Sequence, residues 1–120
     1  MQIKIGNDII SSIRIEQLCN KHGSRFLDKV FTKNEIAYCE NRNKNKYLSY
    51  AARFAAKEAV FKAVSSTLEN KYVLGWKDIE ILNDASGRPF VNIKGLNYNI
   101  DVSISHEREY AIASAIAIIE

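Results

Sequence analysis

The sequence predicts a single α+β domain in which an N-terminal strand and three helices precede a run of antiparallel strands. Three observations lead to this prediction. The first residues alternate between polar and apolar, an Ala-rich block without Gly or Pro fills the middle, and the last third alternates again. The chain has 120 residues, 47% of them hydrophobic, and no repeat or linker-like stretch, so one domain should span residues 1–120.

The chain begins with a predicted strand followed by a polar interruption. Gln2–Ile5 alternates polar and apolar residues, which is typical of a half-buried strand. Gly6-Asn7-Asp8 follows, and these residue types tolerate the backbone angles found in turns. We therefore expect Asp8 at a strand end, where an isolated aspartate is most often a turn residue.

Two short helices are expected before the central one. The first begins at Ser11 or Ser12 as its N-cap and ends at Gly23, because glycine accepts the backbone angles that stop a helix. The second begins at Thr32, since Thr32 and Glu35 have the spacing of a capping box. Two apolar residues occupy the flanking staple positions: Phe31 and Ile36.

The strongest helix signal is Leu48–Ser66, where Ala dominates and apolar residues recur at helical intervals. The rest of the chain has the alternation of strands. We expect strands at Ile79–Leu82, Phe90–Ile93, Ile100–Ser105 and Tyr110–Ile119, with a turn at Asp84–Arg88 and a hairpin loop at His106–Glu109.

The composition excludes several classes of protein. A net charge of +3 is too small to indicate a nucleic-acid binder by itself, and the glycine fingerprints of dinucleotide and P-loop sites are absent. The longest nearly apolar run, Tyr110–Ile119, is shorter than the ~20 residues of a membrane span. The N-terminus lacks the features of a secretory signal, so we expect the cytoplasm. Cys19 and Cys39 lack metal-ligand spacing and are expected to be reduced packing residues.

Charged residues on the central helix are the first candidates for chemistry. Arg53 and Lys57 are one turn apart, and so are Glu58 and Lys62, so we expect all four charges on one side. By itself such a group is most simply a solvated face that carries an i,i+4 Glu–Lys pair.

Two carboxylates change this interpretation. If Asp8 and Glu58 met, they would repel each other unless one were protonated or a cation lay between them, and hard oxygen ligands suit Mg²⁺ or Mn²⁺. The neighbouring Arg and Lys residues then indicate a polyphosphate ligand. Ser103-Ile104-Ser105-His106 adds polar groups at another strand end, although a lone histidine in a hairpin is most often just exposed.

Several motifs occur together in one order along nearly the whole chain. The most specific is Arg53–Ala63, RFAAKEAVFKA, and Ser103–Glu107, SISHE, is moderately specific. The smaller ones are Gly6-Asn7-Asp8, Arg14, Phe31-Thr32-x-x-Glu35 and Gly87-Arg88-Pro89. In this order the motifs resemble those of the holo-[acyl-carrier-protein] synthases, a type of 4'-phosphopantetheinyl transferase.

The resemblance implies an activity and an assembly. The activity is transfer of the phosphopantetheine arm of coenzyme A to a serine of apo acyl carrier protein, with release of adenosine 3',5'-bisphosphate. It requires Mg²⁺, with Mn²⁺ as an alternative. The assembly is a homotrimer with active sites between subunits, and neither nucleic acid nor a membrane is implied as a partner.

The resemblance also implies roles for individual residues. Asp8 and Glu58 would be the metal ligands, and Glu58 is in addition a candidate to deprotonate the serine. Lys62 would neutralise charge on the leaving phosphate or donate a proton to it. Coenzyme A would be bound by Arg53, Lys57, Lys62, Gly87, Arg88, Pro89, Ser105 and His106, and the acidic carrier protein by Arg14 and Arg25.

Two positions depart from the family's pattern, and two other hypotheses stay open. Asn7 stands where an aliphatic residue is usual and Ser65 where a glycine is common, but neither change removes a functional group. The first alternative is a non-catalytic basic module that binds an anionic partner such as RNA. Carboxylates amid its cations would not help such a module. The second keeps the fold but acts on carrier domains of secondary metabolism or type I synthases.

Overall fold

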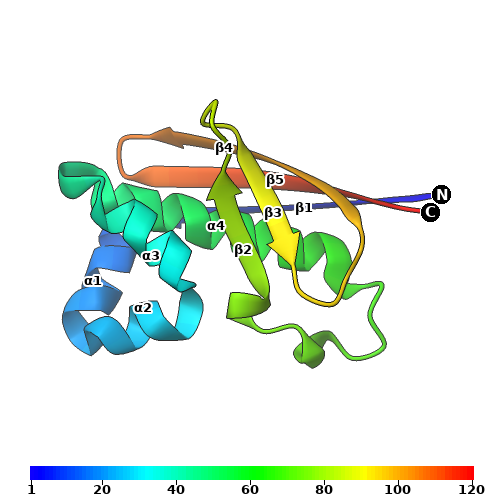
Figure 1. Ribbon diagram of the computed structural model, residues 1–120. Coiled ribbons are helices and arrows are strands. Elements are labelled where there is room, and N and C mark those ends of the chain that lie inside the picture. The colour runs from blue at the N-terminus through cyan, green and yellow to red at the C-terminus, as the bar shows by residue number, and fades with distance from the viewer.

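In the computed structural model of residues 1–120, a long helix lies against one face of a three-stranded antiparallel sheet (Figure 1). The predicted α+β class is confirmed. In chain order the elements are β1 (Gln2–Ser11), α1 (Ser12–His22), α2 (Ser24–Val30), α3 (Lys33–Glu40), η1 (Asn43–Asn45), α4 (Lys46–Ser65), η2 (Lys71–Val73), η3 (Trp76–Asp78), β2 (Ile79–Asn83), β3 (Pro89–Ile93), β4 (Asn99–Glu107) and β5 (Tyr110–Ile119).

The strands form two separate sheets. The larger has the order β1-β5-β4, and β2 pairs with β3 in a hairpin. β1 pairs with β5 along its whole length, from Gln2 opposite Ile119 to Ser11 opposite Tyr110. The two termini therefore lie side by side at one end of the molecule (Figure 1).

The core between α4 and the sheet is built largely from alanine. On β5 the residues Ala111, Ala113, Ala115 and Ala117 alternate with outward-facing ones and are buried against α4. The facing side of α4 is also rich in buried alanine, such as Ala55, Ala56, Ala59 and Ala63. Because these side chains are small, the helix axis can approach the sheet closely.

The close approach explains Gly6 and corrects one prediction. A Cβ atom at Gly6 would lie 2.1 Å from the carbonyl oxygen of Ala59 and 2.8 Å from the nitrogen of Ala63. Gly6 is therefore required by packing, not by a turn, and β1 continues through Asn7 and Asp8 to Ser11. The expectation of a strand end at Asp8 was wrong, because Asp8 pairs with Ala113 in mid-strand.

The predicted helix signals are confirmed at α1 and α3. The Ser11 side chain accepts a hydrogen bond from the Ile13 nitrogen, and Gly23, at φ 62°, ends α1. At α3, Thr32 Oγ1 accepts from the Glu35 nitrogen at 3.2 Å and Glu35 Oε1 accepts from the Thr32 nitrogen at 2.8 Å. The sequence did not predict α2, because the helix resumes directly after Gly23 without an N-cap side chain.

The last hairpin is tighter than predicted. β4 continues through Glu107, so His106 lies in the strand and the turn consists of Arg108 and Glu109. Arg108 adopts φ 55°, the left-handed backbone that a two-residue hairpin turn requires at its first position. The central helix begins at Lys46 and not at Leu48, and Cys19 and Cys39 are free thiols as predicted. None of the helices combines the length and the apolar character that a bilayer crossing requires.

Candidate active site

Asp8, Glu58 and Lys62 lie together where β1 meets α4. Asp8 is two residues beyond Gly6 and shares its face of the strand, so the close approach at Gly6 brings the Asp8 carboxylate to the helix. Lys62 Nζ lies 3.3 Å from Asp8 Oδ1 and donates to the Asn7 carbonyl oxygen at 3.0 Å. The sequence prediction that Asp8 and Glu58 converge is consistent with this arrangement.

The electrostatics of Glu58 follow from that arrangement. Partial burial raises the pKa of the Glu58 carboxyl, and the negative charge of Asp8 raises it further, while the nearby Lys62 ammonium opposes the rise. The expected i,i+4 pair between Glu58 and Lys62 does not form, because Lys62 bonds to Asp8 instead. Two carboxylates thus lie near a single lysine that pairs with only one of them, which leaves negative charge that a cation would neutralise.

The donor set fits a magnesium ion whose remaining ligands come from substrate and water. No group of three or more His, Cys, Asp or Glu side chains gathers anywhere in the chain, so the protein alone cannot fill a coordination sphere. Mg²⁺ is commonly held by one or two carboxylates together with substrate phosphates. Asp8 and Glu58 have that composition.

A pocket of about 320 Å³ lies beside the same helix. Arg53 is buried in its wall, its guanidinium stacks over the Tyr38 ring with Cζ 3.8 Å from the ring centroid, and its Nη2 donates to Asn83 Oδ1. Its Nε has no partner, although it is buried. The lining includes four residues predicted to bind the cofactor, namely Arg53, Gly87, Pro89 and His106.

Four residues predicted to bind the cofactor lie outside this pocket: Lys57, Lys62, Arg88 and Ser105. Arg88 donates to both carboxylate oxygens of Asp101, at 3.2 and 3.1 Å, in an exposed groove across β3 and β4. Ser105 is exposed in a second groove next to Ile9 and Ile112. His106 lines that groove as well as the pocket, so the two are adjacent.

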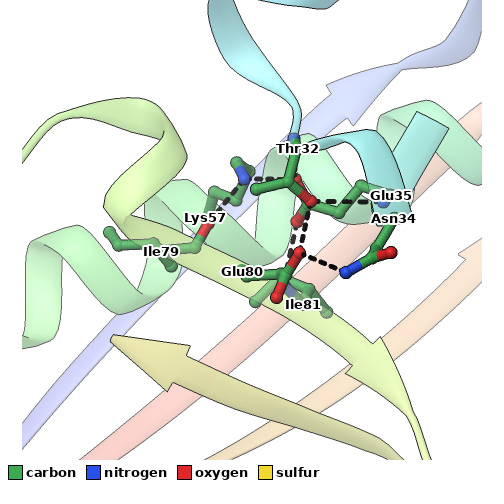
Figure 2. A network of polar contacts seen from close by, with 7 residues as sticks. All are labelled: Thr32, Asn34, Glu35, Lys57, Ile79, Glu80 and Ile81. Carbon is green, nitrogen blue, oxygen red and sulfur yellow. Dashed lines mark hydrogen bonds and ion pairs between the residues drawn. The ribbon is translucent and has the colours of Figure 1, made fainter. Parts of the chain in front are cut away.

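Lys57 occupies an unexpected position. The prediction that four charges share one side of α4 was wrong, because Arg53 and Lys57 are buried whereas Glu58 and Lys62 are partly exposed. At 3.6 residues per turn, positions 57 and 58 point about 100° apart, which separates the two pairs. Lys57 Nζ lies 2.5 Å from both Glu35 Oε1 and the Ile79 carbonyl oxygen (Figure 2).

A second, mainly apolar pocket of about 180 Å³, the apolar slot, is lined by Lys57 and Glu58. Its remaining lining is mainly apolar: Phe61, Leu74, Gly75, Trp76 and Ile79. The Trp76 ring in its wall packs against the Phe54 ring, with the two ring centroids 5.0 Å apart. An extended, largely uncharged chain that ends near Glu58 would suit this slot.

Sequence reasoning missed Tyr38 and Asn83, and it gave Glu35 as a helix cap and as part of a motif without a role in the site. Asn83 is polar and ends an apolar strand just before a turn, which is a signal that we did not use. Tyr38 lies three residues after Glu35 on α3 and gave no signal, because its contact with Arg53 is tertiary. Arg14 and Arg25, the predicted carrier-binding residues, are exposed on α1 and α2.

The fold and the site define a small α+β protein whose central helix α4 contributes to both a carboxylate pair and an arginine-lined pocket. Residues 4–115 match the model of the family described as the 4'-phosphopantetheinyl transferase superfamily. The match covers more than half of the chain, so the chain belongs to this superfamily.

Proteins named holo-[acyl-carrier-protein] synthase are similar over nearly the full length. That of Ruminiclostridium cellulolyticum is 44% identical over 97% of this chain and 92% of its own, and that of Protochlamydia amoebophila is 48% identical over 97% and 98%. The Bacillus anthracis synthase, solved in complex with CoA (3',5'-ADP), has a TM-score of 0.79 at 33% identity, covering 95% of this chain and 94% of its own. The Helicobacter pylori synthase, in complex with coenzyme A, has a TM-score of 0.82 at 31% identity, covering 95% and 99%. The family predicted from the sequence motifs is thereby confirmed.

Proposed function

We propose that this chain transfers the 4'-phosphopantetheine arm of coenzyme A to a serine hydroxyl of apo acyl carrier protein, in a reaction that depends on Mg²⁺. The other product is adenosine 3',5'-bisphosphate. The observation that carries the proposal is the meeting of Asp8 with Glu58 and Lys62 of α4, the helix that also contributes the buried Arg53 to a separate pocket. The names of the relatives and the coenzyme A complexes of the structural neighbours support it.

The pocket beside α4 takes the nucleotide end of coenzyme A. Arg53 has a buried Nε without a partner, and His106 and Arg42 add donors at the rim. Guanidinium groups bind phosphate oxygens with paired, charge-assisted hydrogen bonds. We therefore assign the 3'-phosphate of the nucleotide to Arg53.

The reacting diphosphate lies over Asp8, Glu58 and Lys62. The serine oxygen attacks the phosphorus that carries pantetheine, and the bond from that phosphorus to the oxygen of the 5'-phosphate of the nucleotide breaks. Glu58 takes the serine proton as the general base of the cluster. Lys62 donates to the leaving phosphate oxygen as charge builds there. Asp8 and Glu58 would hold Mg²⁺, which would supply charge neutralisation at the diphosphate.

The pantetheine arm follows the apolar slot. The slot begins at Glu58 and is walled by Phe61, Leu74 and Trp76, so an uncharged chain leaving the diphosphate meets apolar side chains. Burial of that chain stabilises the complex by removing apolar surface from water.

The outer face of the sheet supports a homotrimer with active sites between subunits. Ile3, Ile5 and Ile9 on β1 are 61–68% exposed, and Ile112 and Ile116 on β5 are also exposed. An exposed face with this many large apolar side chains, interrupted only by the Asn7–Ser114 pair, is typical of a protein interface. The groove that holds Ser105 and His106 includes Ile9 and Ile112, so a neighbouring subunit on this face would border the nucleotide pocket.

The carrier protein docks on the basic surface of α1 and α2, where Arg14 and Arg25 are exposed. Positive charge there speeds the encounter with an acidic partner more than it adds affinity. We keep the cytoplasm, expected from the sequence, as the proposed compartment.

The test is a transfer assay read by mass spectrometry. The protein is incubated with coenzyme A, Mg²⁺ and apo acyl carrier protein, and the carrier should gain about 340 Da, the mass of the arm. An unchanged carrier mass, together with RNA binding that weakens steeply with salt, would favour the non-catalytic basic module instead.

A further inference from the structure

Glu35 and Lys57 form a fully buried ion pair at the junction of three elements (Figure 2). Glu35 Oε1 accepts from Lys57 Nζ at 2.5 Å and from the Thr32 nitrogen at 2.8 Å, and Glu35 Oε2 accepts from the Ile81 nitrogen at 2.8 Å. Lys57 Nζ also donates to the Ile79 carbonyl oxygen. The pair therefore ties the start of α3 and the middle of α4 to the backbone of β2.

Stability does not account for such a pair. Removing two charges from water is expensive, and apolar side chains of similar volume in place of a buried ion pair often leave a protein equally or more stable. The pair instead fixes the relative positions of α3, α4 and β2, because three of its hydrogen bonds each join two of these elements.

Each tied element also carries one part of the arginine pocket. Tyr38, which stacks on Arg53, lies three residues after Glu35 on α3, and Arg53 lies one turn before Lys57 on α4. Asn83, which accepts from Arg53, lies two residues after Ile81 on β2 and on the same side of that strand. Arg53 and the two residues that contact its guanidinium, Tyr38 and Asn83, therefore each lie within four residues of a member or a hydrogen-bond partner of the ion pair.

The Lys57 ammonium is closed off from the pocket. It is 0% exposed, and the Phe31 ring lies over it with the centroid 5.7 Å away. A phosphate could reach Lys57 only by displacing Glu35, which would then be left buried with its charge unpaired.

We propose that Glu35 and Lys57 are positioning residues for coenzyme A, which hold Arg53 between Tyr38 and Asn83 and do not bind the phosphates of the substrate. This role rests on the proposed function, and it replaces the phosphate contact that the sequence resemblance implied for Lys57. An outer contact reinforces the tie, since Thr32 Oγ1 donates to Glu80 Oε2 at 2.5 Å.

The test compares three roles for Lys57 by calorimetric titration of coenzyme A in metal-free buffer. The main variant is the double Glu35→Gln/Lys57→Met, which removes both charges and keeps an acceptor for one of the two backbone donors, the Thr32 and Ile81 nitrogens. We expect its melting temperature to stay within a few degrees of the unmodified protein and its dissociation constant for coenzyme A to rise about tenfold. An unchanged dissociation constant in the folded variant would show a purely structural role and overturn the proposal.

The same change is then made in an Arg53→Ala background. If the pair acts through Arg53, the double substitution should weaken coenzyme A binding there by less than about twofold. A loss that stays about tenfold without Arg53 would show that Lys57 contacts the ligand directly, and would also overturn the proposal.

Two further controls keep the outcome clear. Should the double variant not fold, the single variant Lys57→Arg, which keeps the charge and alters the geometry, enters the same comparison with and without Arg53. If the unmodified protein binds no coenzyme A at all, the proposed function fails, whereas binding with independent effects of Lys57 and Arg53 defeats only the positioning role.

Discussion

Lys62 Nζ lies 3.3 Å from Asp8 Oδ1, joining the last turn of α4 to β1 across 54 residues of sequence. The pair is partly solvated, with the Lys62 side chain 51% and the Asp8 side chain 19% exposed. Pairs of this exposure contribute about 0–1 kcal/mol to stability. Its position beside Glu58 therefore matters more for chemistry than for folding.

Removing either carboxylate should stop transfer without unfolding the protein. Asp8→Ala and Glu58→Ala each delete half of the proposed metal site, and metal ions supply several kcal/mol of charge stabilisation, so the rate should fall by more than about 100-fold. Carrier mass after timed incubation measures the rate, and circular dichroism monitors the fold. Glu69→Ala, which removes an exposed loop carboxylate, is the matched control. Full activity in both site variants would show that the site is assigned wrongly.

Glu58→Gln should leave the fold at least as stable as the unmodified protein at neutral pH. Burial and Asp8 raise the pKa of Glu58 in the folded state, so the fold holds this proton more tightly than the unfolded chain does, and ionisation destabilises the fold as pH rises. In metal-free buffer near pH 7, the variant should melt no lower than the unmodified protein. Any advantage should disappear below about pH 4.5, the ordinary value for a glutamate, where Glu58 is protonated in both states. A variant that melts lower at neutral pH would argue against repulsion between the two carboxylates.

Gly6→Ala should destabilise the fold strongly. The added Cβ would meet the Ala59 carbonyl oxygen at 2.1 Å, so β1 and α4 must separate, and overpacking of this kind costs about 1–3 kcal/mol. Gly75→Ala is the control, because a Cβ added at Gly75 would lie 3.5 Å from the nearest atom, Asp78 Oδ2. Urea titration of both variants measures the difference. Equal midpoints would mean that the helix and the strand are not as close as described.

Arg53→Lys should weaken coenzyme A binding while keeping the charge. A lysine cannot reproduce both the stack over Tyr38 and the hydrogen bond to Asn83, so we expect the dissociation constant to rise about tenfold. Coenzyme A lacking its 3'-phosphate serves as the control ligand, and the substitution should affect its binding much less. Equal losses of affinity for the two ligands would show that Arg53 does not bind the 3'-phosphate.

Ile5→Asp should break the proposed trimer. Ile5 lies opposite Ile116 at the centre of the exposed face, so a carboxylate there would be buried without a partner in an assembly. Light scattering should show a trimer for the unmodified protein and a monomer for the variant, and coenzyme A affinity should fall with the assembly. Undiminished binding by the monomer would place the whole nucleotide site within one chain.

The sequence predicted the parts of the fold that local chemistry determines. Gly23 and the capping box of Thr32 and Glu35 act within a few residues, and both are where the sequence placed them. Gly6 was misread as a turn residue because its reason is the α4 backbone, more than 50 residues away. The partner of Lys57 was unpredictable for the same reason, since burial of that face depends on how α3 and β2 close over α4.

The most direct test of the account measures coenzyme A affinity with and without Mg²⁺. If Asp8 and Glu58 hold the ion against the diphosphate, Mg²⁺ should tighten binding to the unmodified protein by about tenfold or more. It should have no effect on the double variant Asp8→Asn/Glu58→Gln, which keeps the shape of both side chains without their charges. The same Mg²⁺ effect in the double variant would contradict the account, because the ion would then be held elsewhere.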